Sequence, residues 1–427
     1  SGPLWVRFSL AFCAAITLSA TLALLGILVY ESASFFGRVP LVSVLGDLEW
    51  TPLSKNPSFG IWPLLSGTLW SIVIAMITSV PSGVFLAMCM SEIASPRLRK
   101  WLRPMMDVLS GIPAVAYGLF AFTFVTPALQ WIHPHVGSFN MLSAGIVLGL
   151  MILPMITSLC EDAMQWVPER YRETARGLGA SPLSIAIHVI IPASLPGIIG
   201  AIFLALSRAL GETLVVAMAA GTIAHVTLDP TESMQTLSSF LLQNGLTQVT
   251  GRGEEQHLVF AVGLLLFVIT LFFYEMGRRF FPQAQGELSR MIHWVHRRRT
   301  RFILTLATVF PAVLLLMFLL WLLQLGLPHL SWEFLVSLPS VDPMKAGVGA
   351  AITGTLLTAL LATMLTLPIG MGAALYLEEF SGRPLWVRML EKNVAALAGV
   401  PSVLYGLVGL GVFVRWMELG RSSLSAG

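Results

Sequence analysis

Long apolar runs alternate with short polar segments along the whole chain. A helix needs about 20 consecutive apolar residues to cross a bilayer, and nine runs reach that length: 8–30, 64–90, 104–131, 141–163, 190–222, 257–280, 302–326, 350–377 and 393–417. Their length and unbroken apolar character exclude the alternating strands of a membrane barrel. The pattern therefore predicts an all-α polytopic membrane protein with about nine transmembrane helices.

The composition agrees with this interpretation. Of the 427 residues, 56% are hydrophobic and 11% are charged, whereas a soluble domain carries about 25% charged residues. The first run fits either a retained helix or a cleaved signal peptide, but it is longer than the usual apolar core of a signal peptide. The three cysteines fall inside apolar runs and the eight histidines are scattered, so no metal site is predicted.

The distribution of lysine and arginine predicts the orientation. If the N-terminus is cytoplasmic, 18 of the 25 Lys and Arg residues fall in cytoplasmic segments and 6 in external ones. Cytoplasmic segments of membrane proteins carry the excess of positive charge. We therefore predict a cytoplasmic N-terminus, with the polar stretch 168–192 on the cytoplasmic side.

Two blocks of sequence occur twice, in the same order. Residues 67–92 match residues 354–379 at eight of 26 positions, and residues 111–119 match residues 399–407 at six of nine. The offset is 287 for the first pair and 288 for the second. Both copies enter the membrane from the same side by the charge count, so the repeat is predicted to be parallel.

The repeat predicts how the chain is divided. A first copy at 1–281 would hold six transmembrane helices, and 302–427 would be the N-terminal part of a second copy, with three helices and incomplete. Residues 282–301 would form a basic cytoplasmic linker. The arginines of this linker either anchor the flanking helices or bind anionic lipid headgroups.

The matched motifs carry a proline and a glycine in each copy, namely Pro113, Gly118, Pro401 and Gly406. Proline interrupts the hydrogen-bond ladder of a helix, and glycine allows close packing. These positions are therefore either hinges of a gate or fixed kinks.

The polar stretch 168–192 predicts two short helices joined by a turn. Pro168 suits the first turn of a helix, and Gly177 or Gly179 can end it. Ser181 and Pro182 are typical of an N-cap and the first residue of a second helix. One face of the first helix would hold Tyr171, Ala175 and Leu178. The stretch is either a docking element for a soluble protein or an amphipathic helix on the lipid headgroups.

The run 190–222 contains two ionisable residues, Arg208 and Glu212. At mid-membrane such a group costs about 2.5–3.5 kcal/mol and usually faces a cavity or a partner. Their spacing predicts that both lie on one face of a single helix. They form either a structural ion pair or part of a path for an anion, because arginine binds oxyanions through its planar fork. A carboxylate beside it would accept the proton of a phosphate P–OH group.

The polar stretch resembles the coupling loop of ABC importer permeases. That pattern is Glu-Ala-Ala, three residues, Gly, nine residues and Ile-x-Leu-Pro, and this chain holds in register Glu173, Ala175, Gly179, Val189, Ile191 and Pro192. It departs from the pattern at three positions, Thr174, Val189 and Ile191. The resemblance implies a type I importer permease fold, in which the loop inserts into a cleft of a cytoplasmic ATPase. It favours docking over the lipid-surface interpretation.

The segment SRALGETLVVAM at 207–218 and the two proline–glycine motifs resemble those of phosphate-importer permeases. The first copy is similar to the C-type subunit and the second to the first half of the A-type subunit. The resemblance implies a permease of the bacterial cytoplasmic (inner) membrane that receives phosphate from an external binding protein. The implied partners are cytoplasmic ATPase subunits, membrane lipid and a chain supplying the rest of the second copy, with no nucleic acid.

The sequence contains no Gly-x4-Gly-Lys-Ser/Thr loop, so the chain itself is not expected to hydrolyse ATP or to bind a cofactor. ATP and Mg²⁺ would bind the partner subunits. Two alternatives remain at this point: a permease for another oxyanion such as molybdate or sulfate, and an ion-coupled secondary transporter, whose repeats are often inverted.

Overall fold

The computed structural model describes residues 4–52, 54–248, 254–280, 313, 316–342, 345–380, 400–420 and 422–426. Within these residues the fold is helical, and its only β-type pairing is an isolated bridge between Trp50 and Phe59. Seven helical segments are long and apolar enough to span a membrane: Phe8–Phe36, Trp62–Ile93, Ala114–Ile132, Met141–Gln165, Pro182–Leu210, His257–Phe280 and Gly349–Leu375. The predicted all-α polytopic class is confirmed.

The remaining two predicted runs, 302–326 and 393–417, lie partly outside the described residues. Their described parts form shorter apolar helices at Leu316–His329 and Ser402–Val414. The predicted linker, residues 282–301, lies wholly outside the described residues.

The chain divides into two compact units. The larger unit comprises Val39–Gln243 and Leu265–Phe318, and the other comprises Ser1–Arg38, Asn244–Leu264 and Leu319–Gly427. These units do not coincide with the predicted copies, whose boundaries stay a prediction.

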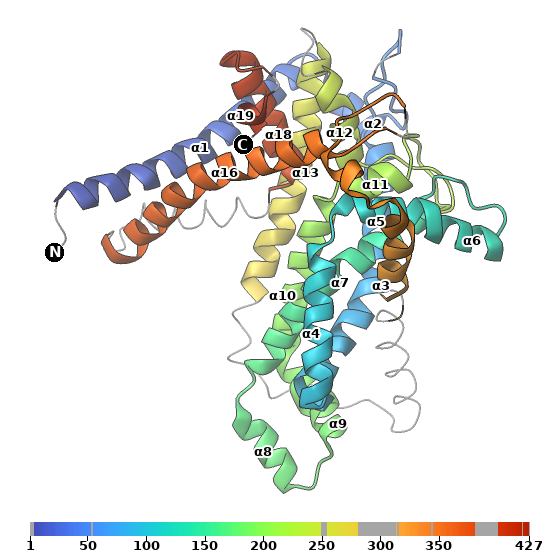
Figure 1. The fold of residues 1–427 in the computed structure, drawn as a ribbon, viewed down its shortest axis with the longest axis vertical. Helices are drawn as coiled ribbons and strands as arrows, with labels where there is room; N and C mark the ends of the chain where they lie inside the picture. The colour runs from blue at the N-terminus through green and yellow to red at the C-terminus, as the bar shows by residue number, and fades with distance from the viewer. Residues whose placement is uncertain are drawn as a thin grey trace. The chain divides into compact units, whose positions relative to one another are not determined.

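Three long helices form the centre of the larger unit, α3 (Trp62–Met88), α7 (Met141–Gln165) and α10 (Ile191–Leu210). Figure 1 shows them running along the length of the unit, and α10 packs against both of the others. Their facing surfaces carry small and branched apolar side chains that are fully buried, and the contact between α3 and α7 is the most extensive between any two described helices. Burial of these surfaces supplies the packing energy that holds the bundle together.

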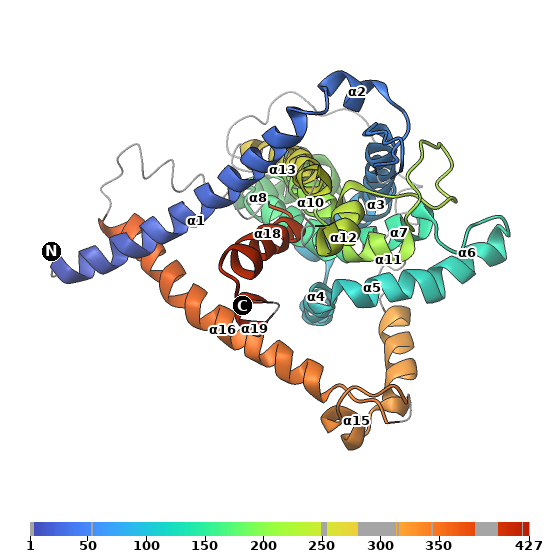
Figure 2. The ribbon, with the colours of Figure 1, turned by 90° about the horizontal axis from the view of Figure 1, so that it is seen from above.

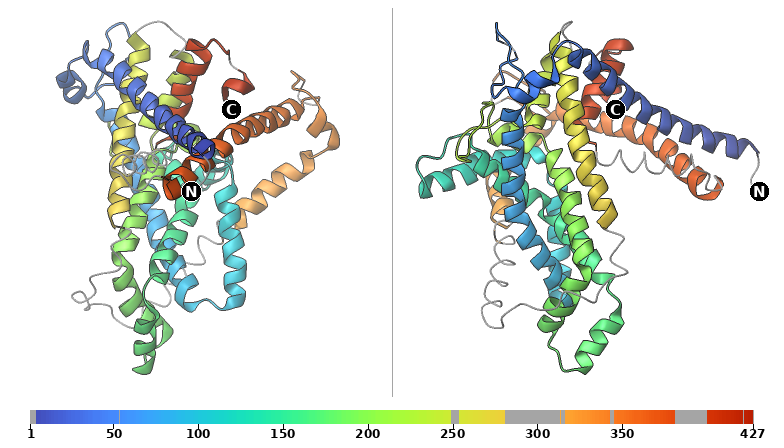
Figure 3. Two further views of the ribbon diagram at one scale, coloured as in Figure 1. Left: turned by 90° about the vertical axis from the view of Figure 1, so that its left-hand side faces the viewer. Right: turned by 180° about the vertical axis from the view of Figure 1, so that it is seen from behind.

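The other helices of the larger unit surround this centre or extend it. They are α2 (Leu41–Gly46), α4 (Pro96–Gly111), α5 (Ala114–Phe120), α6 (Thr126–Ile132), α8 (Glu169–Gly177), α9 (Pro182–Ile185) and α11 (Leu214–Ala219). Two further helices, α12 (Leu237–Gln248) and α13 (Glu254–Phe280), carry residues of both units. Short π-helical segments follow several helices: η1 (Cys89–Ile93), η2 (Ala121–Val125) and η3 (Ala186–Ile190). Figure 3 shows α8 and α9 at one end of the unit, with α2 and α11 toward the other.

Two of the predicted runs are broken in the structure. The run 104–131 contains the end of α4 and the start of α5, separated at Ile112 and Pro113. The run 190–222 ends as a helix at Leu210, and α11 begins only at Leu214. A hydropathy pattern does not reveal either break, because the residues on both sides are apolar or small.

The smaller unit contains α1 (Leu4–Phe36), α15 (Trp332–Val336), α16 (Gly349–Leu375), α18 (Ser402–Gly409) and α19 (Ser423–Ala426). Figure 2 shows α1 and α16 as its two long helices, and they pack against each other through a close approach of Cys13 to Gly372. Two π-helical segments, η6 (Tyr376–Phe380) and η7 (Leu410–Trp416), follow α16 and α18, and η5 (Leu327–His329) is a short 3-10 helix.

Candidate functional site

The polar stretch folds as predicted into a helix, a turn and a second helix. Pro168 is the N-cap of α8, one residue earlier than the predicted first turn. Ser181 caps α9, because its side-chain oxygen accepts a hydrogen bond from the Ser184 N–H at 3.3 Å, and Pro182 occupies the first helical position. The sequence signals for helix starts are therefore confirmed here.

Gly179 ends α8 in a way that explains the spacing between the alanine and the glycine of the coupling-loop pattern. The Gly179 N–H donates to the Arg176 carbonyl at 2.9 Å, and the Ala180 N–H donates to the Ala175 carbonyl at 3.0 Å. These two bonds are the Schellman ending of a helix, which needs a left-handed residue just past the cap. Gly179 supplies this residue with φ +80°. That conformation is energetically unfavourable for every residue that has a Cβ atom.

The face predicted to hold Tyr171, Ala175 and Leu178 is not the buried face of α8. Leu178 is 84% exposed, Glu173 and Gly179 are also exposed, and Ala175 is half-buried. The buried residue of α8 is Arg172. Its charged side chain has a buried partner.

That partner is Glu92, which lies in η1 directly after α3. Arg172 Nη2 donates to Glu92 Oε1 at 2.8 Å, and the side chains are 9% and 6% exposed. Burial acts to lower the pKa of Arg172, but the hydrogen bond and charge of Glu92, with those of Glu169, outweigh it and raise the pKa. The guanidinium therefore stays charged.

A second ion pair lies at the same end of the unit. Arg103 of α4 donates to Glu161 of α7 at 3.1 Å, with 57% and 5% of the side chains exposed. Gln165 also donates to Glu161 at 2.9 Å. This pair joins α4 to α7 and does not involve α8.

Arg208 and Glu212 do not share one helical face, because α10 ends at Leu210 and Glu212 lies in the break before α11. Arg208 is exposed and Glu212 is half-buried. Glu212 Oε1 accepts a hydrogen bond from the Leu214 N–H at 3.3 Å, so the carboxylate caps the first turn of α11. The two described side chains are close enough to interact electrostatically but form no direct ion pair.

The proline–glycine motif of the first copy lies beside this break. Pro113 is the N-cap of α5 and does not interrupt a helix, so neither a proline kink nor a proline hinge inside a helix is present. The Tyr117 hydroxyl donates to the Leu109 carbonyl of α4 at 2.9 Å and ties the two helices across the proline. A Cβ on Gly118 would lie 2.9 Å from Met218 Sδ and 3.0 Å from Met218 Cβ, so a larger residue there would require the Met218 side chain of α11 to shift.

The second copy repeats the first part of this arrangement. Pro401 is the N-cap of α18, and its dihedral angles, φ −58° and ψ 137°, resemble those of Pro113, φ −61° and ψ 140°. Among the described residues, no atom outside the backbone of its own helix lies within 4 Å of the Gly406 Cβ position. Movement at any of these four positions stays a prediction.

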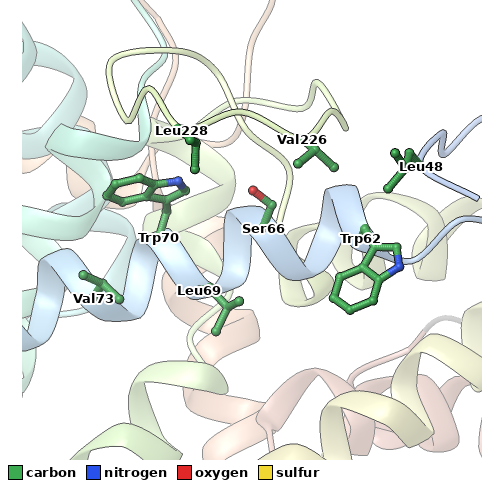
Figure 4. Close-up of a pocket in the computed structure, with 8 residues that line it drawn as sticks. All are labelled: Leu48, Trp62, Ser66, Leu69, Trp70, Val73, Val226 and Leu228. Atoms are coloured by element: carbon green, nitrogen blue, oxygen red, sulfur yellow. The ribbon is translucent and has the colours of Figure 1, made fainter. Parts of the chain in front are cut away.

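A cavity of about 360 Å³ opens at the start of α3 (Figure 4), and its lining includes none of the charged residues described above. It is lined by Leu48, Trp62, Ser66, Leu69, Trp70, Val73, Val226 and Leu228. Its lining is apolar and holds no cationic side chain, so it does not suit an oxyanion. Among the residues that the structure describes, no group of three or more His, Cys, Asp or Glu side chains is placed to hold a metal ion.

Comparison with known proteins identifies related chains. Residues 79–286 match the family described as "Binding-protein-dependent transport system inner membrane component". The probable ABC transporter permease protein YqgH of Bacillus subtilis is 31% identical over 270 residues, which are 62% of this chain and 87% of that protein.

Two further relatives carry a substrate in their names. The phosphate transport system permease protein PstC of Mesorhizobium japonicum is 31% identical over 58% of this chain and 80% of its own length. PstC of Haemophilus influenzae is 29% identical over 63% of this chain and 89% of its own length. Among solved structures, the MetNI methionine ABC transporter in an inward-facing conformation matches 53% of this chain and 95% of its own, at 21% identity and a TM-score of 0.39.

Proposed function

Because the chain belongs to the family of inner membrane components of binding-protein-dependent transport systems, which includes ABC transporter permeases, we propose that it forms part of the translocation path of an ATP-driven phosphate importer. An external binding protein would deliver phosphate, and ATPase subunits would bind at α8. The family decides against an ion-coupled secondary transporter.

The observation that carries the proposal is the exposed Arg208 at the end of α10. An arginine exposed to lipid within an apolar span is costly, so such side chains face a water-filled cavity or a partner subunit. Glu212, whose carboxylate is held by α11, lies within electrostatic reach of it. An arginine fork with a carboxylate nearby suits an oxyanion that still carries a proton, as phosphate does.

The α8 end of the larger unit would be the cytoplasmic end. The distribution of 18 and 6 basic residues and the exposure of Glu173, Leu178 and Gly179 support this assignment. The N-terminus would be cytoplasmic, and ATP and Mg²⁺ would bind only the partner ATPases.

The test is uptake by the complete complex in liposomes, with its binding protein and ATPase subunits. Arg208→Gln should lower phosphate uptake roughly 10- to 100-fold, because a hydrogen bond to a charged group is worth about 1.5–3 kcal/mol. Arg279→Gln is the matched control, since this exposed arginine lies at the end of α13 beside Glu275. Uptake unchanged by Arg208→Gln would contradict the proposed path.

The second candidate function is a permease for sulfate or molybdate. Stimulation of the ATPase by a sulfate-loaded or molybdate-loaded binding protein, without stimulation by phosphate, would replace the substrate and keep the importer.

A further inference from the structure

One guanidinium joins three segments at the α8 end of the larger unit. Arg172 Nε lies 3.1 and 3.2 Å from the two oxygens of Glu92, and Nη2 lies 2.8 Å from Glu92 Oε1. This is the two-pronged geometry in which arginine holds a carboxylate most firmly. Glu92 is therefore fixed in position, and its negative charge is balanced by the guanidinium.

The rest of the guanidinium holds the end of α7. Nη1 donates to the Val167 carbonyl at 2.7 Å, and Nη2 donates to the Met164 carbonyl at 2.9 Å. Nη1 also lies 3.3 Å from Glu169 Oε2, on the exposed side of α8. Each nitrogen of the guanidinium thus has a partner, and only the bond to Glu169 is open to solvent.

These contacts give α8 a fixed relation to the bundle. Glu92 lies in η1, which continues α3 without a break, and Met164 lies in the last turn of α7. The adjacent residue in α8, Glu173, is exposed with Leu178 and Gly179 on the surface proposed to receive the ATPase. A displacement of that surface therefore acts on α3 and α7 through Arg172, because the residues that end both segments are bound to its guanidinium.

We propose that Arg172 and Glu92 form a positioning pair that transmits movement of α8 to α3 and α7, an inference that rests on the proposed docking of an ATPase at α8. The pair does not contact the substrate or the ATPase. Its loss should uncouple ATP hydrolysis from transport without removing the exposed surface that the ATPase binds.

The test compares Glu92→Gln with Glu161→Gln in the complete reconstituted complex. Both residues are buried carboxylates paired with arginine at the same end of the unit, but Glu161 pairs with Arg103 and not with α8. The measured quantity is the number of substrate ions transported per ATP hydrolysed. We expect this ratio to fall at least 10-fold in Glu92→Gln and to stay within 2-fold of the wild type in Glu161→Gln.

A merely structural role predicts a different result. Loss of folded complex would lower hydrolysis and transport together and leave their ratio unchanged, and that outcome overturns the proposal. Arg172→Lys supplies a second variant, because it keeps the charge but loses the two-pronged geometry and should lower the ratio to an intermediate value. A ratio equal to the wild type in this variant would also count against the pair.

A third measurement does not depend on activity. Spin labels at Leu178 and Trp101, both exposed, report the distance from α8 to α4 once the native cysteines Cys13, Cys89 and Cys160 are replaced. The distance distribution should broaden in Glu92→Gln, and an unchanged distribution overturns the proposal.

The substrate assignment fails separately. If the wild type transports sulfate and not phosphate, the phosphate proposal is overturned while the ratio for sulfate still decides the role of the pair. If the wild-type chain recruits no ATPase, both proposals are overturned.

Discussion

The helices α3 and α16 carry the two copies of the repeated block and can be compared position by position. Each has 27 residues with an internal proline, Pro81 or Pro368, and each continues into a five-residue π-helical segment that contains the matched glutamate, Glu92 or Glu379. The local structure is therefore the same. Fourteen residues of α3 are buried, whereas in α16 only Gly372 and Ala373 are.

The difference lies in the neighbours. The face of α3 is covered by α7 and α10, which follow it in the first copy, and the described part of the second copy contains no counterparts of these helices. A helix in a membrane protein keeps its internal hydrogen bonds without tertiary contacts. The repeat thus shows that sequence sets the helix and its π-helical ending, while burial depends on the helices that pack against it.

The largest contrast is expected at the matched glutamates. Glu92→Ala should lower the free energy of unfolding by about 3–5 kcal/mol, because it removes the buried carboxylate of Arg172 and leaves the guanidinium with the exposed Glu169. Glu379→Ala should change it by less than about 0.5 kcal/mol in this chain, because Glu379 is exposed. Tryptophan fluorescence during unfolding in mixed micelles measures both values.

Equal losses of stability at the two glutamates would contradict the inferred difference in their surroundings. A large loss at Glu379 only in the complete complex would show that Glu379 acquires a partner on assembly.

A smaller contrast is expected at the matched glycines, Gly83 and Gly370. A Cβ on Gly83 would lie 2.7 Å from Ile156 Cγ2, where α3 and α7 approach closely. Within the described part of the chain, no atom outside the backbone of its own helix lies within 4 Å of the Gly370 Cβ position. Gly83→Leu should therefore cost about 1–3 kcal/mol through overpacking, and Gly370→Leu should be close to neutral. Thermal unfolding of the two variants in the same detergent distinguishes them, and equal melting temperatures would contradict the difference in packing.

The smallest contrast is expected at the matched threonines. Thr68 Oγ1 accepts a hydrogen bond from the Leu237 N–H at 3.0 Å in a buried position. The exposed Thr355 donates to the Ala351 carbonyl of its own helix and to no other described residue. Thr68→Val leaves that N–H without its partner, at a cost of about 1 kcal/mol. Thr355→Val should have no measurable effect. Faster hydrogen exchange at the start of α12 in Thr68→Val alone would support this, and unchanged exchange would oppose it.

Local sequence signals predicted the helices of the polar stretch well. Apolar length gave the membrane spans, and Ser181 and Gly179 marked a helix start and a helix end because each meets a local requirement of the backbone. The break after Leu210 was missed, although Gly211 and the polar residues after it were a signal for it. It was overlooked because small and apolar residues flank it and a hydropathy window averages over them.

The buried pair of Arg172 and Glu92 could not be predicted from spacing. The two residues are 80 positions apart, and an arginine on a short polar helix is normally exposed. The one available signal is the recurrence of a glutamate, Glu92 and Glu379, at the ends of the matched blocks, and this signal does not identify the partner. Whether Glu173, Ala175, Gly179, Pro192, Arg208 and Glu212 act as predicted stays open to the experiments above.

The turn at Gly179 has a mechanical consequence. It connects α8 to the continuous run of α9, η3 and α10, 29 residues from Pro182 to Leu210, which carries Arg208 in its last turn. At 1.5 Å per residue this rod is about 43 Å long. Tilting such a rod by about 5° at the α8 end displaces its far end by roughly 4 Å. If the run tilts as one rigid body, a small rotation at the α8 end would therefore displace the surroundings of Arg208 by more than the width of a water molecule.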